Sequence, residues 1–369
     1  MQLRPARPGD PVAAIDTPAL VVDLDALTRN LDRMADATKG IRLRPHAKSH
    51  KCAAIARMQL ARGAVGICCQ KTNEALAFVD AGIQDVVVTN EVIAPPKAAR
   101  LAQLASRASV GVLVDSVHGV AVLSGAASHA GTRLDAYIEV DVGAHRCGVA
   151  PGEAAVALAR EVVAAPGLRL RGLQCYQGAA QHLRAPEERR AAIREAAALA
   201  RSTREAIAST GMPCDIVTGA GTGTWQLERD CGAYDELQPG SCVFMDVDYA
   251  RNVVAPSELR FEQSLFVLAG VASVPTAERA VVDAGLKAFA FDSGLPQVHA
   301  RAGVAYIKAS DEHGVLQVAR DAAPVTLGER LWLIPGHCDP TVNLYDWLVA
   351  IREGVVEAVW PIEARGALG

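Results

Sequence analysis

The chain has 369 residues, half of them hydrophobic and 4% aromatic, and a net charge of -4 at pH 7. This length predicts one large domain and a smaller one. The acidic balance argues against a nucleic-acid-binding protein, which needs a basic face. No apolar run approaches the roughly 20 residues of a membrane-spanning helix, and no secretory signal is visible. Nine cysteines without a CxxC pair indicate buried thiols in a reducing compartment, so we expect a cytoplasmic enzyme.

The chain begins with a strand-like run at residues 19–25, followed by a helix with Leu27, Leu31 and Met34 on one face. Apolar strand-like runs then alternate with alanine-rich helical stretches. The expected strands are 41–48, 64–70, 84–89, 109–115, 134–142, 168–176, 214–218 and 236–245. About eight such units predict a (β/α)8 barrel of the TIM type. A doubly wound dinucleotide fold is less favoured, because no G-x-G-x-x-G follows an early strand.

Beyond residue 248 the long helical periods give way to short strand-like pieces. These are 264–274, 279–283, 304–308, 315–318 and 331–334. We therefore expect a barrel domain at residues 26–247 and a β-rich second domain made of residues 1–25 and 248–369. The strand at 19–25 is surplus to a barrel that begins at residue 41, so we expect the first residues to join the C-terminal sheet.

The segment at residues 44–48 ends the first barrel strand and precedes a helix-like segment at 52–62. In an extended chain Arg44, His46 and Lys48 point the same way. Lys48 comes last, at the carboxyl end of the strand, where barrel enzymes have their active sites. Its amine can form a Schiff base with a carbonyl cofactor such as pyridoxal phosphate, provided that its pKa is lowered. The alternative is a solvent-exposed lysine in a basic loop.

A glycine-rich loop follows the expected seventh strand. Its sequence is Thr218-Gly219-Ala220-Gly221-Thr222-Gly223-Thr224. Glycines let the backbone turn its N–H groups toward one point, and threonine hydroxyls add donors, which predicts a phosphate-sized anion site. Barrels commonly bind phosphate after their last two strands. The Gly-Lys-Ser/Thr ending of nucleoside-triphosphate loops is missing, so the phosphate would belong to a cofactor. A tight strand–helix turn is the alternative.

An imidazole and a carboxylate, those of His337 and Asp339, follow the apolar run at 331–334. In an extended chain they share a face while Cys338 points away. Such a pair suits a divalent ion of the manganese or magnesium kind, and also zinc. Two protein ligands leave positions for water or substrate, which indicates a catalytic metal. The alternative is a polar turn capped by Asp339 and Pro340.

Three further polar residues follow expected strand ends. Arg146 lies just after the strand at 134–142, and Tyr176 and His182 lie at or after the end of the strand at 168–176. A histidine in such a loop is a candidate general base. Each of the three residues alone is more often structural, and their shared position at strand carboxyl ends favours a functional role.

Taken together, these segments resemble the D-threonine aldolase and D-serine dehydratase group, which belongs to the alanine racemase-type (fold type III) pyridoxal phosphate enzymes. The resemblance runs over nearly the whole chain. It rests on residues 16–20, 44–48, 139–143, 146–148, 176–178, 181–182, 219–224, 236–241 and 336–340. It implies a barrel plus a β-rich domain, a homodimer with active sites near the subunit interface, and a divalent metal beside the cofactor.

The resemblance also implies residue roles. Lys48 would hold pyridoxal phosphate, Arg146 would face the phenolate oxygen of the cofactor, and Tyr176 would line the site. The phosphate and the rest of the cofactor would contact the loop and the segment at 236–241, through Thr218, Gly219, Gly221, Thr222, Gly223 and Gln238. In relatives a tyrosine can follow the Pro-Gly-Ser turn as partner of the ring nitrogen, whereas this chain has Cys242.

Roles toward the substrate follow in the same way. His182 would remove the proton of the substrate's β-hydroxyl group. His337 and Asp339 would bind the metal, which we expect to be Mn²⁺, with Mg²⁺, Co²⁺ and Zn²⁺ as alternatives.

The group contains aldolases, which cleave the Cα–Cβ bond, and dehydratases, which remove the Cα proton and expel the hydroxyl. In its dehydratases the second metal ligand is typically cysteine, whereas Asp339 stands here, as in its aldolases. We therefore expect a D-threonine aldolase type of activity on β-hydroxy-D-amino acids. A 3-hydroxy-D-aspartate aldolase and a D-serine or 3-hydroxyaspartate dehydratase are alternatives. Two other classes also stay open, a metal-independent pyridoxal phosphate carrier and a cofactor-free metal hydrolase.

Overall fold

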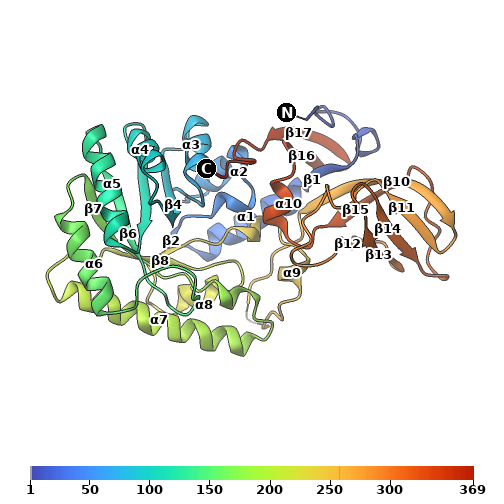
Figure 1. The fold of residues 1–369 in the computed structure, drawn as a ribbon. Coiled ribbons are helices and arrows are strands. Elements are labelled where there is room, and N and C mark those ends of the chain that lie inside the picture. Colours follow the sequence, from blue (N-terminus) through green and yellow to red (C-terminus); the bar gives the residue numbers. More distant parts are fainter. Residues whose placement is uncertain (1, 257) are drawn as a thin grey trace.

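The computed structural model describes residues 2–256 and 258–369, and within them a barrel lies beside a β-rich region (Figure 1). The barrel is an eight-stranded parallel sheet in the order β2-β9-β8-β7-β6-β5-β4-β3. A parallel bridge between His46 and Cys68 joins the two ends of this order. The strands of the barrel are β2 (Arg42–Leu43), β3 (Ile67–Cys69), β4 (Asp85–Glu91), β5 (Ser109–Val114), β6 (Leu134–Glu139), β7 (Leu168–Gln174), β8 (Ile216–Gly219) and β9 (Glu236–Leu237). The predicted (β/α)8 barrel is confirmed.

Helices follow the strands, as the alternating pattern predicts. They are α1 (Leu24–Ala37), α2 (Ala53–Leu60), α3 (Thr72–Asp80), α4 (Pro95–Leu104), α5 (Val117–Ala130), α6 (Glu153–Ala164), α7 (Pro186–Ala208) and α8 (Trp225–Asp230). The first begins where the Asp23 carboxylate accepts two backbone N–H groups, and it buries the expected face of Leu27, Leu31 and Met34. The long α7 runs along the outer side of the barrel (Figure 1).

The first and last barrel strands are much shorter than predicted. The strand expected at 41–48 ends at Leu43, and Ala47–Ser49 forms a 3-10 helix, η2. The prediction of an extended chain through Lys48 is therefore wrong. The chain turns into a 3-10 helix here because of a local cap, in which His46 Nδ1 accepts the backbone N–H of Lys48 at 3.3 Å. The last barrel strand, expected at 236–245, ends at Leu237, and Ser241–Val243 forms another 3-10 helix, η4, without a side-chain cap.

The β-rich region is a nine-stranded sheet with the path β13-β14-β11-β10-β1-β16-β17, in which β15 pairs with β10 and β12 pairs with β15. Its strands are β1 (Ala19–Asp23), β10 (Leu265–Thr276), β11 (Arg279–Val282), β12 (Gln297–Val298), β13 (Val304–Ala309), β14 (Gly314–Val318), β15 (Arg330–Ile334), β16 (Trp347–Arg352) and β17 (Val355–Pro361). Since β1 lies between β10 and β16, the expectation that the first residues join this sheet is confirmed. The domain limits at 25/26 and 247/248 stay a prediction.

A buried ion cluster holds the amino-terminal end of the barrel. Arg44 Nε lies 2.9 Å from Glu236, and its Nη1 lies 2.6 Å from Asp85. Burial opposes the charge of this guanidinium, but the two carboxylates outweigh it and raise the pKa of Arg44. Lys48 is left at the opposite, carboxyl end of the strands. Among the described residues, no helix has the length and apolarity needed to cross a membrane.

Candidate active site

A cavity of about 130 Å³ lies at the carboxyl ends of the barrel strands, and the Lys48 side chain is one of those that line it. Six residues with a sequence-predicted role line it, namely Lys48, Arg146, Tyr176, Gly221, Thr222 and Gln238. A larger cavity of about 220 Å³ lies behind the glycine-rich loop, between Trp225, Arg260 and Phe261. We place the candidate site in the smaller one because the reactive amine lies there.

The Lys48 ammonium pairs with the Asp339 carboxylate, although 291 residues separate them. Asp339 lies in the first turn of α10 (Cys338–Val342) and also accepts a hydrogen bond from Ser241 Oγ at 3.1 Å. Burial of Lys48 opposes its charge, but the Asp339 carboxylate outweighs this effect and raises the pKa of Lys48. The lowered lysine pKa that the sequence-based interpretation required is therefore not found in this structure.

His337 Nδ1 lies 2.6 Å from Asp292 Oδ2. The backbone at His337 is extended, with φ at -141°, but α10 starts at Cys338, where the prediction of an extended chain fails. The reason is again a cap, since the Asp246 carboxylate accepts the Cys338 N–H at 2.9 Å. Among the described residues, no third His, Cys, Asp or Glu joins His337 and Asp339 in a compact group.

His182 ends a 3-10 helix, η3 (Ala179–His182), and its Nδ1 lies 2.6 Å from Asp248 Oδ2. Asp248 belongs to the short α9 (Val247–Ala250) and also pairs with Arg184. Burial opposes the charge of Asp248, but the hydrogen bond from Arg184 and the nearby His182 lower its pKa. The ring of Tyr249, which lines the cavity, lies 5.8 Å from the His182 ring. His182 itself is not among the residues that line the cavity, and it lies next to the cavity only through Tyr249.

The glycine-rich loop only partly faces the cavity. Gly221 and Thr222 line it, whereas Thr218, Gly219 and Gly223 are not among the lining residues. Thr218 Oγ1 instead accepts a hydrogen bond from Gln238 Nε2 at 2.8 Å.

Close packing explains two of the glycines in this loop. A Cβ at Gly221 would lie 2.5 Å from the Gln181 side chain, and a Cβ at Gly223 would lie 2.6 Å from the Gln181 carbonyl oxygen. Gln181 also donates to Thr224 Oγ1 at 2.8 Å and accepts from the Gly223 N–H at 2.9 Å. The loop is thus tied to the residue that precedes His182.

Arg146 extends over the Tyr176 ring, with 5.8 Å between its guanidinium carbon and the ring centre. Its Nη2 lies 3.5 Å from Glu139 Oε1, at the end of β6. Burial, together with the neighbouring Glu91 carboxyl, raises the pKa of Glu139 to about 9. The ion pair of Arg146 with Glu139 is therefore weak, and the Arg146 side chain, which lines the cavity, is half exposed.

Sequence reasoning missed four residues that support these side chains. They are Gln181, Asp248, Asp292 and Ser241. Gln181 and Ser241 lie in segments that carry the family resemblance but were given no role, and no spacing in the sequence reveals the pairs that the four residues form. Cys242, the residue noted at the ring-nitrogen position of relatives, is buried and does not line the cavity, while its N–H donates to Thr222 Oγ1 at 3.0 Å. Burial raises the pKa of this thiol to about 12.

Comparison with known families agrees with this geometry. Residues 22–248 match the model of the alanine racemase N-terminal domain, and residues 264–351 match that of a putative serine dehydratase domain. The chain belongs to the alanine racemase N-terminal domain family. Membership implies pyridoxal phosphate as the cofactor, and the cavity with Lys48 lies in the part of the chain that matches.

Three relatives of this family are similar to the chain over almost its full length. A D-threonine aldolase of Arthrobacter sp is 48% identical, with 98% of this chain and 96% of the relative covered. A 3-hydroxy-D-aspartate aldolase of Paracoccus denitrificans is 47% identical, covering 98% of this chain and 95% of the relative. The crystal structure of D-threonine aldolase from Filomicrobium marinum has a TM-score of 0.97 at 48% identity, covering 99% of this chain and all of that one.

Proposed function

We propose that this protein is a pyridoxal phosphate- and divalent metal-dependent lyase that cleaves β-hydroxy-D-amino acids to glycine and an aldehyde, with D-threonine as a substrate. The observation that carries the proposal is the contact of Asp339 with Lys48, which lines the cavity. It brings the residue for the cofactor next to a residue for the metal. The full-length similarity to a D-threonine aldolase supports the same activity.

The side chains around the cavity fit pyridoxal phosphate. The Lys48 side chain lines the cavity and is 40% exposed, so a carbonyl group can reach it for covalent attachment. Gly221 and the Thr222 hydroxyl would hold the phosphate, Arg146 would face the phenolate, and Tyr176 and Gln238 would flank the ring. Of the other loop positions, Thr218, Gly219 and Gly223 would act by shaping the loop, because they do not line the cavity.

The donor set at His337 and Asp339 fits a divalent metal ion, Mn²⁺ in first place. Asp292 occupies Nδ1 of His337, which leaves Nε2 free to bind the ion. A carboxylate behind a ligating histidine is a common arrangement in metal sites. When bound, pyridoxal phosphate would supply an electron sink for the breaking Cα–Cβ bond, and the metal a Lewis acid for the substrate hydroxyl.

His182 would take the proton of the β-hydroxyl group at Nε2. Asp248 accepts from Nδ1, so it holds the imidazole in the tautomer that leaves Nε2 as an acceptor. The Asp248 carboxylate would also stabilise the imidazolium that forms. Arg184 fixes Asp248 from the other side, partly through a 2.7 Å bond to its carbonyl oxygen.

The charges around the cavity favour threonine over 3-hydroxyaspartate as substrate. Among the described residues that line it, the cationic side chains are those of Lys48 and Arg146. Both would be engaged by the cofactor, which leaves no lining cation to pair with a second carboxylate of the substrate. A 3-hydroxy-D-aspartate aldolase, as in the Paracoccus relative, is the second candidate because that relative is nearly as similar.

The test is a product assay with purified, pyridoxal phosphate-loaded protein. We expect glycine and acetaldehyde from D-threonine with Mn²⁺, and loss of both products with EDTA. Formation of 2-oxobutanoate and ammonia instead would overturn the aldolase and establish a dehydratase. Cleavage of 3-hydroxy-D-aspartate but not of D-threonine would establish the second candidate. Loss of activity in Asp339→Asn, with an unchanged visible absorbance of bound pyridoxal phosphate, would separate the metal site from the cofactor site.

We also infer a homodimer in the cytoplasm. The resemblance to the fold type III enzymes implies the dimer, with active sites near the subunit interface. The nine free cysteines support a reducing compartment. Sedimentation of the loaded protein tests the dimer.

A further inference from the structure

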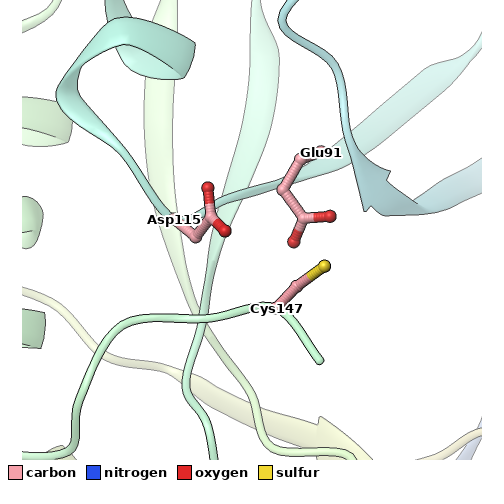
Figure 2. Close-up of side chains that lie close together, drawn as sticks. All are labelled: Glu91, Asp115 and Cys147. Carbon is pink, nitrogen blue, oxygen red and sulfur yellow. The ribbon is translucent and has the colours of Figure 1, made fainter. Parts of the chain in front are cut away.

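Three potential metal ligands outside the cavity meet at the carboxyl ends of successive barrel strands. Glu91 ends β4, Asp115 follows β5, and Cys147 lies in the loop after β6. Their ligand atoms all lie within 4.8 Å of one another. Figure 2 shows the three side chains pointing toward a common centre. None of the three lines the cavity that contains Lys48.

A fourth acidic side chain, that of Glu139, is buried against this group without a hydrogen-bond partner on one oxygen. Glu139 is 5% exposed, and its Oε2 has no partner among the described residues. It faces the Glu91 carboxyl, whose Oε1 is also buried and without a partner in the described part of the chain. Buried carboxyl oxygens normally have partners. The raised pKa of Glu139 keeps a proton between the two carboxyl groups when no ion is bound, and a divalent cation that takes the place of this proton would satisfy both oxygens.

The positive charge near these acids does not balance them. Arg146 is the guanidinium that reaches the group, at 3.5 Å from Glu139, and it is half exposed over Tyr176. From the described residues, the Asp115 side chain accepts a single long hydrogen bond, from the Gly148 N–H at 3.3 Å. Among the described residues, the contact between Arg146 and Glu139 is the only ion pair that any of the three carboxyl groups of Glu91, Asp115 and Glu139 makes.

We propose that Glu91, Asp115 and Cys147 bind a second divalent cation, with Glu139 as a fourth oxygen donor or as the partner that orients Glu91. The thiolate favours a borderline-soft ion such as Zn²⁺ or Cd²⁺ over Mg²⁺ or Mn²⁺. The cation would join the ends of β4 and β5 to the loop after β6, which also carries Arg146. This site is separate from His337 and Asp339, and the proposal goes beyond the proposed function.

The experiment measures Cd²⁺ binding to the pyridoxal phosphate-loaded protein. Equilibrium dialysis counts bound ions, and the ultraviolet thiolate-to-cadmium charge-transfer band reports a sulfur ligand. We expect about two Cd²⁺ per chain with the thiolate band in the unmodified protein. In Cys147→Ser the count falls to about one and the band disappears. In Glu91→Gln the affinity of the thiolate site falls about tenfold or more.

Cys338→Ser is the matched control, because this buried thiol lies 3.2 Å from Asp339 at the other proposed metal site. It should keep the band and both ions. A band that persists in Cys147→Ser, a band lost only in Cys338→Ser, or no band in the unmodified protein would overturn the proposal. The visible absorbance of bound pyridoxal phosphate checks that each variant folds. Ion counts do not depend on catalysis, so this outcome is distinguishable from failure of the proposed function.

Discussion

The imidazole of His182 and the carboxylate of Asp248 lie 2.6 Å apart, Nδ1 to Oδ2, although 66 residues separate them in the chain. One lies in a loop of the barrel and the other in α9, where the chain leaves the barrel. The pair therefore forms only when both parts are folded together. A surface role would be the ordinary interpretation of an isolated histidine, whereas the Asp248 carboxylate orients this imidazole next to Tyr249, which lines the cavity.

Asp248→Asn should lower kcat for D-threonine cleavage by about 10–100-fold. An amide nitrogen can donate to Nδ1, which would place the imidazole proton on Nε2 and block the acceptor. The variant for comparison is His182→Ala, which should lower kcat for D-threonine cleavage by at least the same factor. Bound pyridoxal phosphate, followed by its visible absorbance, should be unaffected. A kcat within about twofold of the unmodified protein would show that Asp248 does not orient the base.

Asp292→Asn should weaken Mn²⁺ binding about 10–100-fold, because the His337 imidazole loses the carboxylate that orients it. Manganese electron paramagnetic resonance or calorimetry measures the affinity directly. Asp321→Asn, at an exposed position in the β-rich region, is the charge-matched control and should leave the affinity unchanged. Equal affinities in the two variants would contradict a role of Asp292 at the metal.

The barrel could be predicted because its strands are continuous apolar runs separated by helical periods. In β4 and β5, for example, the predicted strands at 84–89 and 109–115 overlap the observed Asp85–Glu91 and Ser109–Val114. The same rule failed at β2 and β9, where a 3-10 helix replaces the end of the expected strand, with a side-chain cap from His46 at η2 and none at η4. It also missed β16 and β17, which follow the polar turn region after α10.

The candidate site was predictable as a set of residue types, but not as a set of contacts. Lys48, Arg146 and Tyr176 stand at strand ends and could be found by their position. The pairing of Lys48 with Asp339 and of His337 with Asp292 joins residues 291 and 45 positions apart. The first contact depends on how α10 packs against η2, and the second on how the residue before α10 lies against Asp292. A single sequence carries no signal for either arrangement.

Gly223→Ala should weaken pyridoxal phosphate binding about 10–100-fold, since overpacking by one methyl group commonly costs about 1–3 kcal/mol. Its Cβ would lie 2.6 Å from the Gln181 carbonyl oxygen, so either the loop or the segment before His182 must move. Gly125→Ala is the control, because its Cβ would meet nothing within 4 Å. It lies inside α5 and should raise the stability by about 0.5–1 kcal/mol. Cofactor titration that gives equal affinities for both variants would exclude this packing explanation.

The last prediction concerns Glu228, a fully buried carboxyl behind the glycine-rich loop. Burial raises its pKa from 4.5 to about 7, while Thr224 Oγ1 donates to its Oε1 at 2.8 Å. The unfolded chain loses this proton near pH 4.5 and the folded chain keeps it to about pH 7. The folded state therefore loses stability as the pH rises through this window, and the full contribution is present only below it.

Glu228→Gln should remove this loss, because glutamine stays neutral and still accepts from Thr224. We expect the free energy of unfolding of the variant to match that of the unmodified protein near pH 4.5 and to exceed it by about 2–3 kcal/mol above pH 7. Urea unfolding at the two pH values measures the difference. Glu205→Gln, at an exposed position on α7, should show no such pH dependence. An equal effect of Glu228→Gln at both pH values would mean that Glu228 is charged in the folded protein throughout, with a cationic partner replacing the proton.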